Sequence, residues 1–240
     1  MIAYIDENTK NWMNRETVCH GMDDIGVEVR LTDTDDPPFD YEGIYYGNTG
    51  YSHRVLTQLG YNIPPLAHVP EGLIQYSGRS VEEVSLEYAL MRSRTHKQFI
   101  KPIPANHKRF TGLVIESGRD LLPLANYGMD ERVLMSPAID IVSEWRCFVH
   151  KKSVLGSRFY HGDFKISPNY YDVVRWAREW DKSPIAYSMD VGITAEGKTI
   201  IVECNDVLSL GWYGFFPTIA ANMLVDRWDE IHSQHKWMKK

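Results

Sequence analysis

Residues 189–206 have the sequence MDVGITAEGKTIIVECND, which predicts two β-strands joined by a tight turn. Alternate residues of a strand share a face, so Glu203 and Asn205 point in the same direction. An antiparallel partner strand brings Asp190 beside them. The segment therefore predicts that two carboxylates and one side-chain amide gather at one end of a hairpin.

The same segment matches the P-loop pattern G-x-x-x-x-G-K-T, from Gly192 to Thr199. A working P-loop needs a helix after the lysine, because the helix N-terminus and the loop amides bind the phosphates. Here Lys198 is followed by Thr-Ile-Ile-Val, a β-branched run that predicts a strand. We therefore interpret residues 195–198 as a hairpin turn and reject the P-loop.

Asp190, Glu203 and Asn205 form a set of hard oxygen ligands. Carboxylate and amide oxygens are the ligands that hold Mg²⁺ between a protein and substrate phosphates. Glu203 and Asn205 also follow the apolar run 200–202, where polar groups are expensive to bury. The alternative interpretation is an ordinary surface hairpin with acidic tips.

An aspartate, a glycine-containing turn and then Glu-x-Asn resemble the metal-binding end of the ATP-grasp superfamily. The resemblance implies that these three residues hold one or two Mg²⁺ ions, which bridge the phosphates of ATP. Further segments follow in the family's order over about residues 80–225. They are Phe99-Ile100-Lys101-Pro102 for the phosphate-contacting lysine, residues 106–112 with Lys108 for the covering loop, residues 133–140 for the strand entering the adenine hinge, and the strand pair with Arg146 and Arg158.

The resemblance implies a role for each matching side chain. Lys101 and Lys108 are expected to neutralise phosphate oxygens, and Arg146 and Arg158 to clamp a planar anion on the substrate side. Arg146 could instead pair with an acidic side chain for structural reasons. The full nucleotide-binding set that we expect is Lys101, Lys108, Ser136, Pro137, Ala138, Ile139 and Glu144.

The arginine pair and the Glu-Cys-Asn-Asp ending most resemble a small ATP-grasp group of phages and bacteria, named for two arginines and a lysine. The chain departs from family patterns in two places. Its covering loop is not glycine-rich, and Ser188 stands where some carboxylate ligases of the superfamily have an arginine. The way in which those ligases anchor their substrate therefore cannot be transferred to this chain.

The order of the expected elements indicates an α+β fold. The resemblance implies two α+β subdomains that grip ATP, preceded by a small α/β domain, with limits at 1–75, 76–140 and 141–240. Ser80 and Glu83 have the spacing of a capping box at the start of a helix. Expected helices cover 51–59, 80–91, 168–180 and 218–231, and expected strands cover 25–31, 43–47, 98–101, 112–115, 131–136, 143–150, 153–160, 185–191 and 199–204.

Composition and charge exclude several classes of protein. The chain has 240 residues, 43% hydrophobic and 24% charged, which is typical of a folded protein and not of a disordered one. No apolar run approaches the ~18 residues of a membrane span, and we expect no signal peptide. Three widely spaced cysteines without a C-x-x-C pair indicate a reducing, cytoplasmic setting.

The net charge of −6 argues against nucleic acid as a partner. Residues 1–42 carry eleven acids and three bases, whereas residues 92–119 carry seven bases and one acid. A basic cluster within an acidic chain suits a small polyanion such as a nucleotide.

The sequence therefore predicts an ATP- and Mg²⁺-dependent carboxylate–amine ligase that acts through an acylphosphate and releases ADP and phosphate. Its substrates would be a small-molecule or peptide carboxylate and an amine. The alternatives are a phosphotransferase that uses the same site and a catalytically silent nucleotide-binding module that regulates a partner. The complete metal set argues against the silent module. The substrates, the role of the N-terminal domain and the oligomeric state stay open.

Overall fold

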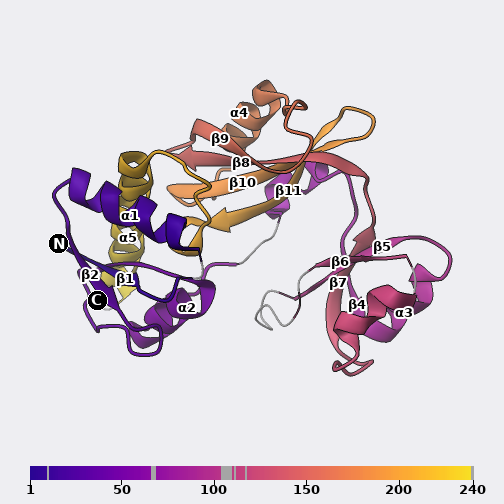
Figure 1. The fold of residues 1–240 in the computed structure, drawn as a ribbon, viewed down its shortest axis with the longest axis horizontal. Helices are drawn as coiled ribbons and strands as arrows, with labels where there is room; N and C mark the ends of the chain where they lie inside the picture. The colour runs from indigo at the N-terminus through magenta and orange to yellow at the C-terminus, as the bar shows by residue number, and fades with distance from the viewer. Residues whose placement is uncertain (10, 66–68, 104–109, 111, 117, 239–240) are drawn as a thin grey trace.

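The computed structural model describes residues 1–9, 11–65, 69–103, 110, 112–116 and 118–238. The described strands form three sheets, each accompanied by helices (Figure 1). This mixture of helices with largely antiparallel sheets is the α+β class that the sequence predicts. Within the described ranges, no helix is both long and apolar enough to cross a membrane.

The first sheet is parallel, with the strand order β2-β1-β3. Its core combines residues 3–61 with residues 207–231, because the last helix of the chain returns to pack on it (Figure 1). The elements of this unit are β1 (Ile2–Asp6), α1 (Trp12–Asp24), β2 (Glu28–Thr32), β3 (Ile44–Tyr46), α2 (Thr49–Gln58) and α5 (Pro217–Met238).

Helices α1 and α5 pack closely together. A Cβ added at Gly21 of α1 would lie 2.0 Å from the Pro217 carbonyl oxygen, so only glycine allows this approach. No pattern in the sequence predicted α1, since its few buried residues make a weak signal among charged neighbours. Most helical stability comes from tertiary packing, and the partner of α1 lies almost 200 residues away. The domain limits stay a prediction, although α5 shares its core with the first sheet.

The second sheet is antiparallel, with the strand order β4-β7-β5-β6. Helix α3 and a 3-10 helix at Gly118–Leu124 contribute to the core beside it. Its elements are β4 (Glu82–Ser85), α3 (Leu86–Ser93), β5 (Gln98–Pro102), β6 (Leu113–Ile115) and β7 (Arg132–Pro137).

The predicted start of the helix at 80–91 is wrong. Residues 82–85 form β4 and pair with β7, and the helix begins only at Leu86, where the Ser85 Oγ accepts from the Tyr88 amide at 3.2 Å. The Glu83 carboxylate accepts from Arg132 Nε at 3.2 Å instead of capping a helix. Pairing with β7 therefore prevails over the local capping pattern.

The third sheet is antiparallel, with the strand order β11-β10-β8-β9. Helix α4 contributes Val173 and Trp176 to the core on one face of this sheet. The elements are β8 (Ile141–His150), β9 (Ser153–Gly162), α4 (Tyr170–Glu179), β10 (Ala186–Thr194) and β11 (Thr199–Asp206). Both predicted hairpins are confirmed. Gly197 has φ 80° in the turn between β10 and β11, and a strand follows this turn, so the rejection of the P-loop is also confirmed.

Candidate nucleotide and metal site

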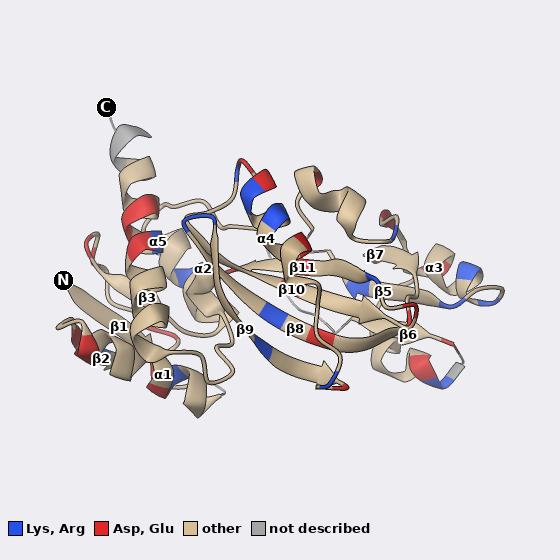
Figure 2. Cartoon of the chain, turned by 90° about the horizontal axis from the view of Figure 1, so that it is seen from above, with Lys and Arg blue, Asp and Glu red and all other residues tan. Residues whose placement is uncertain are grey.

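A row of four charged side chains crosses the third sheet. The strand register places Glu203 beside Asp190, Asp190 beside Arg146, and Arg146 beside Arg158. Directly paired residues of neighbouring strands lie on the same face of a sheet. Figure 2 shows basic positions in the middle of β8 and β9. Four of the predicted site residues therefore lie on one face, ordered from two acids to two bases.

Arg146 and Asp190 form a buried bidentate ion pair. Arg146 Nε donates to Asp190 Oδ1 at 2.8 Å, and Nη2 donates to Oδ2 at 2.6 Å. Arg146 Nη1 donates to the carbonyl oxygen of Gly211 at 3.0 Å. Only 9% of Arg146 and 2% of Asp190 are exposed. These contacts use three of the five N–H groups of the guanidinium.

Burial and ion pairing act in opposite directions on these two groups. Burial raises the pKa of Asp190 and outweighs the opposing charge and hydrogen bonds of Arg146. Burial acts to lower the pKa of Arg146, but the charge and hydrogen bonds of Asp190 prevail and raise it. The bidentate geometry is that of a guanidinium with an ionised carboxylate. The predicted metal ligand Asp190 is thus hydrogen-bonded to the predicted substrate arginine.

Lys101 connects the second sheet to the third. Its Nζ lies 3.8 Å from Glu203 Oε2, and the Asn205 Nδ2 donates to Glu203 Oε1 at 3.1 Å. Burial lowers the pKa of Lys101, and the charge of Glu203 opposes this effect. The predicted phosphate lysine and two predicted metal ligands therefore lie together where the two sheets meet.

The donor set at this point suits a hard cation. In the part of the chain that the structure describes, no three His, Cys, Asp or Glu side chains are grouped to hold a metal ion by themselves. A cation beside Glu203 would therefore need Asn205 and ligands from outside the protein. Mg²⁺ commonly binds in this way, through one or two carboxylates, waters and substrate phosphates.

Arg158 lies on the substrate side of the row without an acidic partner among the described residues. Its Nη1 donates to the Ser157 carbonyl at 2.9 Å, and its Nε and Nη2 lie 3.4 and 3.3 Å from the Gly214 carbonyl oxygen. Its guanidinium carbon lies 5.2 Å from the ring centroids of both Phe215 and Phe216. This cation is therefore held in place by carbonyls and rings, and its charge is available to an anion.

A cavity of about 240 Å³ lies beside Lys101, between the second and third sheets. It contains two buried polar atoms, Ser136 Oγ and Arg79 Nε, that have no hydrogen-bond partner among the described residues. A buried polar group without a partner costs about 1–3 kcal/mol. The cavity therefore fits a ligand that offers hydrogen bonds. Its lining residues are Val69, Ile74, Arg79, Val81, Phe99, Lys101, Leu134, Met135, Ser136 and Val202.

Arg79 is a candidate site residue that sequence reasoning missed. Its guanidinium carbon lies 5.1 Å from the centroid of the Phe99 ring, and its Nη2 donates to the Val202 carbonyl at 3.4 Å. Burial lowers its pKa, against the charge of Glu203. Arg79 belongs to no motif and precedes the first strand of its sheet, so only the nearby Gly78, at φ 68°, signals unusual local backbone.

The remaining predicted residues lie around this cavity or outside the described chain. Pro137 and Ala138 line a second cavity of about 430 Å³, which shares Ser136 with the first. Ile139 is half-buried near Gly78. The Glu144 carboxylate accepts from the Tyr160 hydroxyl at 2.9 Å. Lys108 and most of the predicted covering loop lie outside the described residues.

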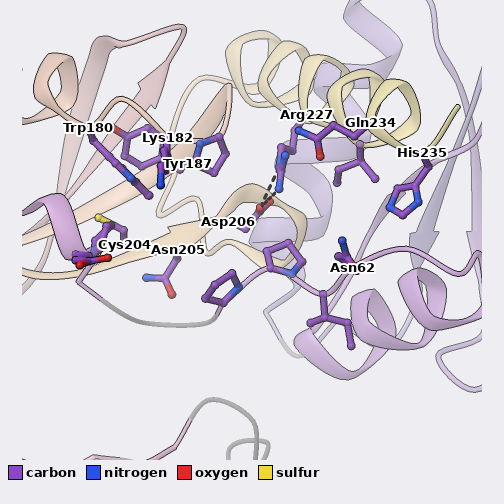
Figure 3. A pocket seen from close by; sticks show the side chains of 17 residues that line it. Asn62, Trp180, Lys182, Tyr187, Cys204, Asn205, Asp206, Arg227, Gln234 and His235 are labelled. Carbon is purple, nitrogen blue, oxygen red and sulfur yellow. Dashed lines mark hydrogen bonds and ion pairs between the residues drawn. The ribbon is translucent and has the colours of Figure 1, made fainter. Parts of the chain in front are cut away.

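A further cavity of about 360 Å³ lies along β11, an edge strand of the third sheet, and borders Asn205. Figure 3 shows Trp180, Lys182 and Tyr187 on one side of it, and Asn62 and His235 on the other. The buried ion pair of Asp206 and Arg227, with 2.7 Å from Oδ2 to Nη2, lies between the two sides. The volume is at the lower end of the ~300–1,000 Å³ typical of ligand pockets, so a small molecule would fit next to a predicted metal ligand.

A family model of the ATP-grasp domain, the second family of its clade, matches residues 76–223. The chain belongs to this ATP-grasp family. The match includes Arg79, Lys101, the charged row and Asn205, and it leaves out most of the first sheet's unit. A comparison with curated protein sequences found no match.

Solved structures resemble this ATP-grasp chain over nearly its whole length. A RimK-domain ATP-grasp protein from Sphaerobacter thermophilus has a TM-score of 0.59 at 12% identity, covering 97% of this chain and 98% of the other. The D-alanine–D-alanine ligase from Bacillus anthracis has 0.56 at 11%, with 98% and 99% covered. The ATP-grasp ligase PsnB, complexed with minimal precursor, Mg and ADP, has 0.52 at 13%, with 95% and 96% covered. Similarity at these identities confirms the predicted ATP-grasp fold.

Proposed function

We propose that this ATP-grasp protein is an ATP- and Mg²⁺-dependent carboxylate–amine ligase. The observation that carries the proposal is the charged row, which has acids beside Lys101 at one end and two arginines at the other. Such a row can bind a metal–phosphate group and a carboxylate next to each other. Family membership supports the use of ATP, and the structural similarity to a D-alanine–D-alanine ligase and to a ligase complexed with Mg and ADP is consistent with this reaction class.

In this proposal the nucleotide occupies the cavity between the second and third sheets. Ser136 Oγ and Arg79 Nε would give their missing hydrogen bonds to it, and apolar residues would cover the base. Lys101 would then lie beside the phosphates, where its positive charge offsets theirs. Positioning and charge neutralisation are the main contributions that a protein makes to phosphoryl transfer.

Glu203 and Asn205, together with Asp190, would hold Mg²⁺. When bound, the ion supplies Lewis-acid stabilisation of the phosphate charge. Both oxygens of Asp190 already accept from Arg146, so any contact to a cation would use their remaining lone pairs. The same ion pair keeps the Arg146 guanidinium in a fixed orientation beside the metal ligands.

Arg158 and the N–H groups that Arg146 has left over would bind the carboxylate substrate. A carboxylate oxygen then attacks the γ-phosphorus, and the bond to the bridging oxygen of ADP breaks. The amine attacks the acyl carbon of the resulting acylphosphate and loses a proton, and phosphate leaves. The protein's part in these steps is to align the carboxylate, because a well-oriented reaction gains several kcal/mol over free encounter.

The test is product analysis with ATP, Mg²⁺ and a pool of amino acids and peptides. We expect ADP formation that depends on a carboxylate, and a hydroxamate when hydroxylamine replaces the amine. AMP and pyrophosphate would contradict the proposed chemistry. ADP with a stable phosphorylated product and no dependence on an amine would favour the phosphotransferase, and ATP binding without turnover would favour the regulatory module.

A further inference from the structure

The segment 207–216 connects β11 to α5 and supports both arginines of the row; we name it the support loop. Arg146 Nη1 donates to the Gly211 carbonyl at 3.0 Å, and Arg158 Nη2 lies 3.3 Å from the Gly214 carbonyl oxygen. A Cβ added at Gly211 would lie 3.2 Å from Arg146 Nη1, which leaves little room for a side chain there. The position of this loop therefore determines the position of both guanidinium groups.

The first sheet and its helices hold the support loop on both sides of Gly211. The Tyr46 hydroxyl at the end of β3 donates to the Leu210 carbonyl at 2.7 Å. The Asn14 Oδ1 of α1 accepts from the Trp212 amide at 2.8 Å. Tyr46 is only 1% exposed, so water cannot readily replace its hydroxyl. Gly211 thus lies between two residues whose backbone atoms are fixed by the N-terminal unit.

Aromatic packing fixes the same loop against the third sheet. The fully buried Trp212 stacks on Phe148 of β8, with ring centroids 5.6 Å apart, and Phe215 stacks on Phe148 at 4.0 Å. Between them, Tyr213 adopts φ 50° and places its ring centroid 5.2 Å from the Arg146 guanidinium carbon. A non-glycine residue at positive φ persists where its surroundings over-determine it. The loop is therefore rigid where it meets Arg146.

We infer that Tyr46 and Asn14 are positioning residues through which the N-terminal unit orients Arg146 for the carboxylate. Two of the three hydrogen bonds of Arg146 go to Asp190, and the third goes to Gly211, so a shift of Gly211 would tilt the guanidinium about Asp190. As far as it concerns the substrate, the inference rests on the proposed function. It assigns the N-terminal unit a role in substrate alignment and none in binding ATP.

The test compares Tyr46→Phe with Tyr45→Phe. Both tyrosines are buried in β3, and both lose one hydroxyl, but the Tyr45 hydroxyl contacts Pro38 and Asp40 instead of the support loop. With the carboxylate found by product analysis, Tyr46→Phe is expected to raise its KM about fivefold, equivalent to about 1 kcal/mol, with the ATP dissociation constant unchanged. Tyr45→Phe is expected to leave both values unchanged.

A second measurement needs no activity. Phenylglyoxal modifies accessible guanidinium groups, and peptide mapping by mass spectrometry gives the rate at Arg146. We expect faster labelling of Arg146 in Tyr46→Phe than in Tyr45→Phe or the unmodified protein. Asn14→Leu should behave like Tyr46→Phe, whereas Asn14→Asp, which keeps an oxygen acceptor for the Trp212 amide, should restore the slow rate.

Equal labelling of Arg146 in the two tyrosine variants would overturn the inference, whatever the activity. A parallel loss of ATP affinity in Tyr46→Phe would also overturn it, because it would indicate general loosening of the fold. If the unmodified protein shows no carboxylate-dependent ADP formation, the proposed function fails, and the labelling result still decides whether the N-terminal unit positions Arg146.

Discussion

Replacing Ser136 by alanine is expected to have opposite effects on the free protein and on its complex with ATP. The Ser136 side chain is 2% exposed, and its Oγ has no hydrogen-bond partner among the described residues. It lines the cavity in which we place the nucleotide. The hydroxyl therefore costs stability in the free protein and gains a partner only when a ligand is bound.

The magnitudes follow from the cost of burying an unpaired polar group, about 1–3 kcal/mol. Taking the lower value, Ser136→Ala should raise the free energy of unfolding by about 1 kcal/mol. Losing one hydrogen bond to the nucleotide should weaken ATP binding by about the same energy, which is about a fivefold rise in the dissociation constant. A gain in stability combined with a loss of affinity is unusual, so this pair of signs tests the assignment well.

Urea unfolding followed by fluorescence and ATP titration by calorimetry measure the two quantities. Ser143→Ala is the matched control. Ser143 is fully buried, but its Oγ donates to the Ile166 carbonyl at 2.8 Å and accepts from Trp145 Nε1 at 2.9 Å, so its loss should destabilise the protein and spare ATP binding. Destabilisation by Ser136→Ala with unchanged ATP affinity would refute the reasoning, because it would mean that Ser136 has a structural partner.

Three further substitutions test other parts of the site. Glu203→Gln should lower turnover by orders of magnitude while the unfolding curve stays close to that of the unmodified protein, because a charged metal ligand is lost at a partly exposed strand end; full activity at saturating Mg²⁺ would remove Glu203 from the metal site. Lys101→Ala should weaken ATP binding strongly and Lys198→Ala should not, since Lys198 is exposed on a hairpin turn; the reverse result in the same titration would restore the P-loop interpretation. Arg158→Ala should abolish the trapping of a hydroxamate but keep ATP affinity, because its contacts are carbonyls and rings on the substrate side; retained trapping would mean that the carboxylate binds elsewhere.

The sequence predicts the parts of this site that depend on neighbouring strands. Each hairpin joins two strands through a short turn, so alternation and turn residues were sufficient to pair β8 with β9 and β10 with β11. Asp190 and Glu203 could be expected side by side for this reason. The limits of the helix at α3 were wrong because β4 pairs with β7, about 50 residues later, and no local pattern reports that pairing.

Contacts between distant segments were not predictable from these patterns. Helix α1 depends on α5, and Arg79 gains its surroundings only when the second and third sheets meet. The pairing of β10 with β8, which is not a hairpin, brings Asp190 onto Arg146. Sequence patterns assigned these two residues separate roles, one toward the metal and the other toward the substrate, and the fold joins them in one ion pair.

This ion pair changes how substitutions in the row must be interpreted. Arg146→Ala would leave the Asp190 carboxylate buried without its partner, and breaking a buried pair in this way costs about 3–5 kcal/mol. A loss of activity in that variant would therefore combine unfolding, a disturbed metal ligand and a missing substrate contact. Arg158 has no carboxylate partner among the described residues, so its removal leaves no buried charge behind. The substrate side of the row is accordingly best tested at Arg158, and the orientation of Arg146 is best tested from outside the pair, through Tyr46 and the support loop.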